Sequence, residues 1–210
     1  AGNTSASATT DIEVDVSAPS VAITSAALTN DATPVISGTA EAGSTVTVTV
    51  AGATYTATAA GGTWSVDTET ATPDSGTLSI DANGDNSVSV TATDVAGNTS
   101  TAVTQTLTVD TTAPTAPTIA TVSTDDLINS TESADGFNLT GTGEAGATVT
   151  VTGFASADKT ATVQGDGTWS IAVADADLAD DATTTLTATQ TDAAGNTSAS
   201  ATTDIEVDVS

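Results

Sequence analysis

Short runs in which apolar and polar residues alternate occupy most of this chain. The clearest is Val46-Thr47-Val48-Thr49-Val50, which has the two-residue period of a strand with one buried face. Similar runs predict strands throughout two successive stretches of about 95 residues each. These runs cover 21–24, 35–38, 45–50, 54–59, 63–67, 87–93 and 103–109, and then 137–140, 148–152, 160–163, 168–173, 184–191 and 204–209.

Turn residues separate these runs and indicate how they are connected. Gly61-Gly62 predicts a two-residue hairpin turn. We expect a weak extra strand at 78–80 and one helical turn near 175–178. The rest is rich in Thr, Val and Gly, which form helices poorly. About seven short strands per stretch, joined by turns, predict an all-β fold made of antiparallel β-sandwiches.

The chain is internally repetitive. Residues 1–17 and 194–210 share the sequence AGNTSASATTDIEVDVS, and a close variant begins at Ala96. The repeat is therefore about 95 residues long, which is the size of one small domain. We divide the chain into the final loop and strand of a preceding repeat (1–17), repeat one (18–112) and repeat two (113–210).

The amino-acid composition limits the classes of partner that the chain can bind. The 210 residues include one Lys or Arg and 27 Asp or Glu, so the net charge is −26. A nucleic-acid binder needs clustered cations, and an anionic membrane would repel this chain. No apolar run is long enough to cross a bilayer. Multivalent cations are the natural partners; the alternative is that the acids only keep the protein soluble.

The missing residue types narrow the chemistry. The chain has no Cys, His or Met, which argues against zinc and other soft-metal sites. General acid–base and nucleophilic catalysis also lack their usual residues, so we do not expect an enzyme. Hydrophobic residues make up 38% of the chain but aromatic residues only 2%, which predicts a thin core of Val and Ala.

Acidic residues are expected to converge where the chain enters each sandwich. With antiparallel hairpin succession, the second-to-third and sixth-to-seventh loops lie at this N-terminal pole. In repeat two these loops hold Glu144 and Asp192, and the chain arrives through Asp110. The same reasoning applies to repeat one. The candidate metal ligands are Asp15, Glu41, Asp94 and Asn98 at the first pole and Asp110, Glu144, Asp192 and Asn196 at the second.

Calcium suits such a set of residues. Three neighbouring carboxylates repel one another unless a cation lies among them, and Ca²⁺ takes six to eight oxygen ligands. The alternative is that Asp and Asn are there for turn geometry. That alternative explains Asp94 and Asn98, but Glu41 and Glu144 are poor turn formers. A weaker second site is possible at the opposite pole, with acids at Asp125, Asp126, Asn129, Glu132 and Asp135, and at Asp81, Asn83 and Asp85.

Each repeat carries one tryptophan at the same position. Trp64 lies in GTWS at 62–65 and Trp169 in GTWS at 167–170. We interpret both as core residues between the sheets, since large aromatic residues dominate sandwich cores. The alternative is a sugar-stacking residue, but no second aromatic residue lies nearby in the sequence.

Several motifs recur in order and support a resemblance. They are GTAEAG at 38–43 and GTGEAG at 141–146, the two GTWS motifs, DVAGN at 94–98 and DAAGN at 192–196, and VDTTAP at 109–114. Together they resemble the bacterial immunoglobulin-like tandem repeats of giant secreted RTX-type adhesins, over the whole chain. The resemblance implies two tandem immunoglobulin-like antiparallel β-sandwich domains in an extended array.

The resemblance also implies a function. Such repeats are extender segments on the bacterial cell surface, which hold a distal adhesion domain away from the cell, and in several families calcium stiffens their junctions. The implied partners are neighbouring repeats of the same chain and calcium ions, in a monomeric extracellular rod. The alternative function is direct binding of a ligand or surface. Saturable calcium binding that a chelator removes favours the extender; glycan or ice binding without a calcium response favours the alternative.

Overall fold

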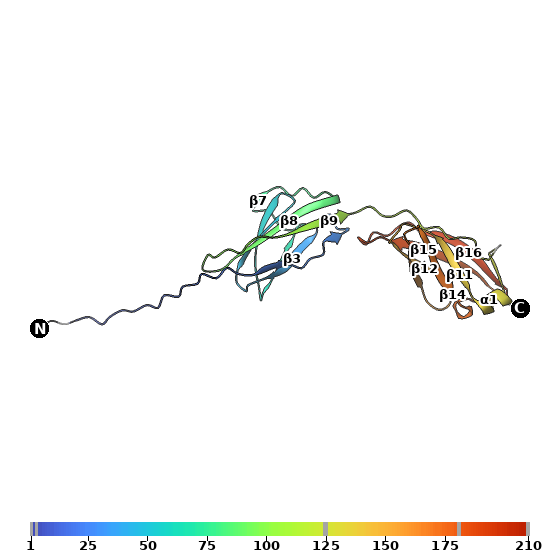
Figure 1. Ribbon diagram of the computed structural model, residues 1–210, viewed down its shortest axis with the longest axis horizontal. Coiled ribbons are helices and arrows are strands. Elements are labelled where there is room, and N and C mark those ends of the chain that lie inside the picture. The colour runs from blue at the N-terminus through green and yellow to red at the C-terminus, as the bar shows by residue number, and fades with distance from the viewer. Residues whose placement is uncertain (1, 3, 124–125, 180–181, 209–210) are drawn as a thin grey trace. The chain divides into compact units, whose positions relative to one another are not determined.

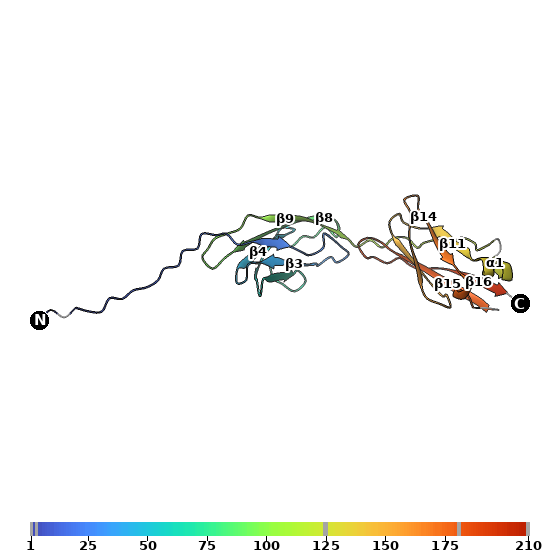
Figure 2. The same cartoon turned by 60° about the horizontal axis from the view of Figure 1, so that its bottom comes forward.

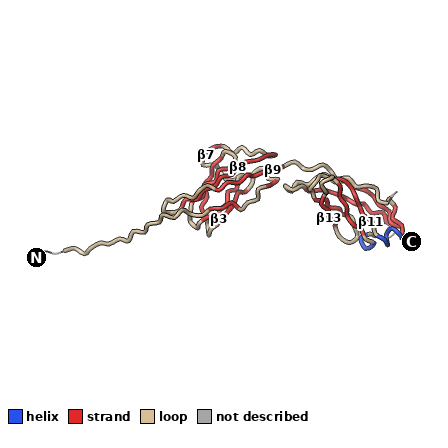
Figure 3. Tube along the Cα trace, viewed as in Figure 1, coloured by secondary structure: helices blue, strands red, loops and turns tan. Residues whose placement is uncertain are grey.

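The computed structural model describes residues 2, 4–123, 126–179 and 182–208, and its regular secondary structure is almost all strand (Figures 1 and 3). The chain divides into two compact units. One consists of Ala1–Ala27, Thr33–Asp81 and Asp85–Leu107, and the other of Leu28–Ala32, Ala82–Gly84 and Thr108–Ser210. Strand β9 (Val103–Asp110) runs through the division at Leu107.

Repeat one contains nine strands in two sheets. The smaller sheet has the order β1-β3-β6 and the larger has the order β2-β9-β8-β4-β5-β7. The strands are β1 (Val21–Ile23), β2 (Leu28–Thr29), β3 (Val35–Ala40), β4 (Thr45–Val50), β5 (Ala53–Thr58), β6 (Thr63–Asp67), β7 (Ser75–Gly76), β8 (Asn83–Thr93) and β9 (Val103–Asp110). Figure 2 labels β3 of the smaller sheet and β4, β8 and β9 of the larger sheet in a turned view.

Repeat two also has two sheets, with two short helical elements among its described residues. One sheet has the order β10-β16-β15-β12-β13, and the other is the pair β11-β14. The elements are β10 (Leu127–Asn129), α1 (Ser130–Asp135), β11 (Phe137–Thr142), β12 (Thr148–Thr152), β13 (Lys159–Thr162), β14 (Thr168–Val173), η1 (Asp175–Asp177), β15 (Ala182–Thr191) and β16 (Ala201–Asp208). Neither helix in the described part of the chain is long and apolar enough to cross a bilayer.

Most predicted strands are confirmed, to within a few residues at their ends. The hairpin at Gly61-Gly62 is confirmed too, since Ala60 and Thr63 exchange backbone hydrogen bonds across it and both glycines have positive φ. The helical turn near 175 is present as η1. The last residue of the strand predicted at 204–209 lies outside the described residues.

Three features differ from the prediction. The extra strand lies at β7, rather than at 78–80, because Ser75 and Gly76 are the residues that reach the edge of β5. Strands β2 and β10 were not predicted, and each pairs in parallel with the last strand of its repeat. Helix α1 was not predicted either. It begins at a capping box, in which Asn129 accepts from the N–H of Glu132 and Glu132 accepts from the N–H of Asn129.

The two tryptophans are core residues, as predicted. Trp64 is 3% exposed and Trp169 is 2% exposed. Each indole N–H donates to a backbone carbonyl, that of Thr39 in repeat one and that of Thr142 in repeat two. The buried valines of β4 and β12 line the same cores. The polar edge of each ring is thus paired while its apolar body is buried.

One sequence adopts two environments in this chain. In β16 the sequence ATTDIEVD forms a strand in which Ile205 and Val207 are at most 1% exposed. In residues 4–20 the same sequence forms no strand, and Ile12 is 83% exposed. Burial therefore depends on a partner sheet and not on the segment alone. Whether residues 1–17 complete a preceding repeat stays a prediction.

Candidate functional site

Strand register brings three loops of each repeat to one pole. In repeat two, Thr142 pairs with Thr168, and Thr148 pairs with both Thr162 and Thr191. The loops 143–147, 163–167 and 192–200 therefore lie at the same end of the sandwich. In repeat one, the pairing of Thr45 with Thr58 and Thr93 places the equivalent loops together. This is the loop arrangement that hairpin succession predicts.

The loop at 94–98 is held by its own side chains. The Asp94 carboxylate accepts from the backbone N–H of Asn98 at 2.8 Å and from the Asn98 side-chain amide at 2.8 Å. That amide also donates to the backbone carbonyl of Asp15 at 3.1 Å. Gly97, with φ of 95°, makes the turn that lets Asn98 face Asp94. The loop thus holds the segment that leads into repeat one.

The loop at 192–196 repeats this arrangement. The Asp192 carboxylate accepts from the backbone N–H groups of Gly195 and Asn196 and from the Asn196 side-chain amide. The Asn196 amide then donates to the backbone carbonyl of Asp110 at 2.7 Å. Two loops far apart in sequence therefore make the same contact with the segment that precedes each repeat.

These hydrogen bonds keep both aspartates ionised. The Asn98 side chain is the main reason why the pKa of Asp94 lies below its ordinary value; partial burial opposes it, and backbone N–H groups of the loop add to it. At Asp192, burial is the largest single influence and raises the pKa. The donors from Asn196, Gly195 and Ala194 together outweigh it, so the pKa is again lowered.

The remaining candidate ligands lie differently. Asp15 and Asp110 each accept a hydrogen bond from the N–H two residues ahead, and they meet the loops through their carbonyls. Glu41 and Glu144 are exposed, and their backbone groups make the turn contacts. Among the described residues, no group of three or more Asp and Glu is close enough to hold a metal ion.

The donor chemistry at each pole still suits a hard cation. Each pole combines an ionised Asp carboxylate, an Asn side chain, a backbone carbonyl and an exposed Glu one loop away. These are the oxygen ligands that Ca²⁺ takes in proteins. A cation that uses the Asp15 or Asp110 carboxylate would need that side chain to leave its turn. The structure brings Asp94 with Asn98 and Asp192 with Asn196, and does not bring the two Glu side chains to them.

Three residues of the predicted site at the opposite pole have structural partners. The Asp126 carboxylate accepts from the N–H of Val122 at 2.7 Å. Asn129 and Glu132 form the capping box of α1, and the Ser123 hydroxyl lowers the pKa of Glu132, with help from the N–H of Asn129. Asp125 lies outside the described residues. The second, weaker cation site stays a prediction.

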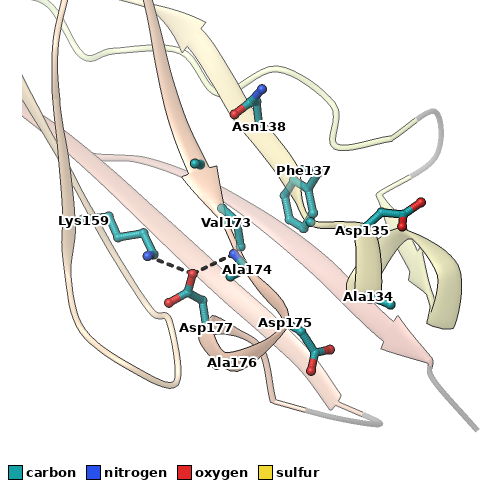
Figure 4. Close-up of a pocket in the computed structure, with 12 residues that line it drawn as sticks. Ala134, Asp135, Phe137, Asn138, Lys159, Val173, Ala174, Asp175, Ala176 and Asp177 are labelled. Carbon is teal, nitrogen blue, oxygen red and sulfur yellow. Dashed lines mark hydrogen bonds and ion pairs between the residues drawn. The ribbon is translucent and has the colours of Figure 1, made fainter.

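Lys159, the one Lys or Arg of the sequence, lies beside a hollow in repeat two (Figure 4). Lys159 Nζ is 2.8 Å from an Asp177 carboxylate oxygen, and their side chains are 25% and 10% exposed. Asp177 also accepts from the Ser156 hydroxyl and from the N–H of Ala174. The adjacent hollow of about 690 Å³ is lined by Phe137 among others. This network attaches η1 to β13.

The network predicts a pH dependence. Contact with Lys159, followed by the Ser156 and Ala174 donors, lowers the pKa of Asp177 to about 2. A lowered pKa gives stability that is fully present above the unfolded value of about 4 and is lost as the pH falls toward 2. The other acids titrate too, so the parent must be compared with Asp177→Asn. Urea unfolding at pH 6, 4 and 2 should show a difference between the two proteins that narrows across this window. A constant difference would contradict the prediction.

Comparisons with known proteins agree with the fold of two β-sandwiches. A family model described as a bacterial Ig-like domain matches residues 17–111, and one described as a bacterial Ig domain matches residues 113–207. Repeat one and repeat two therefore each match a separate model of the same kind of domain. No curated protein has a sequence that matches the chain.

Solved structures with similar sequences include three segments of adhesion proteins. One is a Ca²⁺-stabilised, ice-binding adhesin of an Antarctic bacterium, with 32% identity over 93% of this chain and 50% of that chain and a TM-score of 0.41. Another is a tetra-tandem repeat from the extending region of a large adhesion protein, with 26% identity over 90% and 49% and a TM-score of 0.36. The third is an immunoglobulin-like domain of the M. primoryensis ice-binding adhesin, with 33% identity over 47% of this chain and all of that chain and a TM-score of 0.36. The chain spans about half the length of the first two.

Proposed function

Since this chain belongs to the family of bacterial immunoglobulin-like domains, which are not enzymes, we propose a structural role for it. We propose that it is an extender segment of a bacterial cell-surface adhesin. In this role the two repeats hold a distal adhesion domain away from the cell and act outside it. The sequence identity to a repeat from an adhesin's extending region supports this proposal. The net charge of −26, with only one Lys or Arg, suits a spacer segment that binds calcium. It does not suit a segment that binds nucleic acid.

The proposal assigns calcium to the pole loops. The proposed ligands are Asp15, Glu41, Asp94 and Asn98 at one pole and Asp110, Glu144, Asp192 and Asn196 at the other. Bound calcium would join the loops to the segment that leads into each repeat. The proposal rests on one contact that both repeats make. In each, the side-chain amide of an Asn, which an ionised Asp of the same loop holds, donates to the backbone carbonyl of the Asp in the leading segment. The 32% identity to a Ca²⁺-stabilised adhesin supports the same metal.

The test is a comparison of shape with and without calcium. Small-angle scattering of the two-repeat chain should give a longer maximum dimension in calcium than in chelator, because the junctional carboxylates repel one another without a cation. Calcium should also raise the free energy of unfolding, by about 2.7 kcal/mol at one hundred times the dissociation constant. Calorimetric titration supplies that constant.

Variants separate the mechanism from general charge effects. Asp110→Ala should remove the calcium-dependent lengthening while both repeats stay folded. Glu206→Ala removes one acid from an exposed position of β16, beside Leu127 of β10, and should respond to calcium like the parent. Equal dimensions in calcium and chelator would contradict the stiffening. Glycan or ice binding with no calcium response would favour a direct adhesive module instead.

A further inference from the structure

Repeat two contains a fully buried polar side chain that touches the incoming segment. Gln190 on β15 is 0% exposed. Its amide nitrogen donates to the backbone carbonyl of Thr115 at 2.6 Å, and its amide oxygen accepts from the backbone N–H of Glu144 at 3.0 Å. Both ends of the amide are therefore paired, which is the condition for burying it without a large cost. The amide bridges the leading segment and the loop after β11.

Repeat one has alanine at this position. Gln190 pairs with Val149 across β15 and β12, and Ala92 pairs with Val46 across β8 and β4. The backbone of each residue exchanges hydrogen bonds with a serine, Ser198 in one case and Ser100 in the other. The two positions are thus equivalent, and the long polar side chain is specific to repeat two.

A second difference makes room for the glutamine. Gly143 follows β11 and donates its N–H to the carbonyl of Gly167, while the equivalent Ala40 at the end of β3 donates to that of Gly62. A Cβ added to Gly143 would overlap the amide oxygen of Gln190. The residues at these two positions therefore differ together between the repeats. Repeat one has alanine at both, and repeat two has glycine at one and glutamine at the other.

The bridge replaces a direct backbone hydrogen bond. In repeat one, the Glu41 N–H donates directly to the carbonyl of Ser20 at 3.3 Å. In repeat two, the equivalent Glu144 N–H reaches the leading segment only through the Gln190 amide. The leading segment is also one residue longer there. It runs from Asp110 to Thr118, against Asp15 to Ala22 in repeat one, where Thr118 and Ala22 present equivalent carbonyls to Gly141 and Gly38.

We propose that Gln190 is a positioning residue, which, with Gly143, fastens the longer leading segment to repeat two at Thr115. The fastening uses no metal, so it acts in addition to the calcium stiffening proposed above and does not depend on it. It fixes the segment at Thr115, five residues after Asp110, whose carbonyl accepts from Asn196. At the corresponding place, the shorter segment of repeat one has the backbone hydrogen bond from the Glu41 N–H to the Ser20 carbonyl.

The test measures order in the leading segment directly. In the parent protein, in chelator, backbone ¹⁵N relaxation should give Thr115 and Ala116 order parameters close to those of β12. In Gln190→Ala both values should fall, and exchange of the Glu144 amide should accelerate about tenfold or more, because its partner is gone. Amides of β12 and β15 away from position 190 should keep their protection.

A paired variant keeps the test decisive if the single variant unfolds. Gly143→Ala/Gln190→Ala recreates the Ala40 and Ala92 pair of repeat one, and should fold while its leading segment remains mobile. Gly143→Ala alone should lower the melting temperature more than this double variant does, since only the single variant forces a methyl group onto Gln190. The proposal is overturned if Thr115 stays as ordered in the double variant as in the parent, or if Gly143→Ala is equally harmful in both backgrounds. Neither outcome bears on calcium binding.

Discussion

Replacing Trp64 or Trp169 with alanine is expected to lower the free energy of unfolding of its own repeat by about 3–5 kcal/mol. Each indole is at most 3% exposed and lies in a core whose other buried hydrophobic residues are Val, Ala, Ile and Leu, with one Tyr in repeat one. Neighbouring side chains relax only partly into such a cavity, so its cost adds to that of the lost apolar burial. The loss of the indole hydrogen bond to Thr39 or Thr142 adds to it.

The chain offers its own control for this experiment. It has two tryptophans, one in each repeat, so in either variant the remaining tryptophan reports the fluorescence of the other repeat. That transition should keep its denaturant midpoint, while circular dichroism shows an earlier transition for the altered repeat. Val95→Ala, at a side chain 93% exposed, should change stability by less than about 0.5 kcal/mol. A small stability loss accompanied by lost ligand binding would make the tryptophan a binding residue instead.

Gly38→Ala and Gly141→Ala are expected to destabilise their repeats by about 3 kcal/mol, at the upper end for overpacking. A Cβ at Gly38 would overlap the carbonyl of Ala22 and the ring of Trp64. A Cβ at Gly141 would overlap the carbonyl of Thr118 and the ring of Trp169. The carbonyls belong to paired backbone, and the rings are buried, so neither can move without loss of hydrogen bonds or packing.

Gly165→Ala is the matched control, because an added Cβ there meets no atom within 4 Å. In urea unfolding, Gly38→Ala and Gly141→Ala should each have a lower midpoint concentration than the parent. Gly165→Ala should have a midpoint close to that of the parent. If all three variants unfold like the parent, the close packing of indole on glycine is not what selects glycine at 38 and 141. Crystal structures of the variants would then show how the segment before β3 or β11 makes room.

Much of the fold follows from local pattern in this chain. Alternation of valine and threonine identifies β4 and β12, because a strand buried on one face requires that period. The GTWS motif identifies the buried ring of each repeat, since an isolated large aromatic residue among small apolar ones belongs to the core. The order of hairpins also places the DVAGN and DAAGN loops at the pole where the chain enters.

The details of the site depended on contacts between distant segments. The sequence predicts that Glu41 and Glu144 join the aspartates, yet their backbone groups serve the turns and their side chains face solvent. The carbonyls of Asp15 and Asp110 are the groups that meet the loops. Residue type reveals the charge of a side chain, but any residue can offer a carbonyl, so sequence cannot identify this contact.

The sequence by itself determined the two sandwiches, most of their strands, the buried tryptophan of each core and the acidic character of each pole, because periodicity, residue size and charge are local properties. Only the tertiary structure decided that β2 and β10 pair in parallel at the edges and that Asn98 and Asn196 hold backbone carbonyls. It also decided that Gln190 bridges Thr115 and Glu144. Each of these contacts joins residues many positions apart, and their positions are set by the register of whole sheets rather than by any one segment.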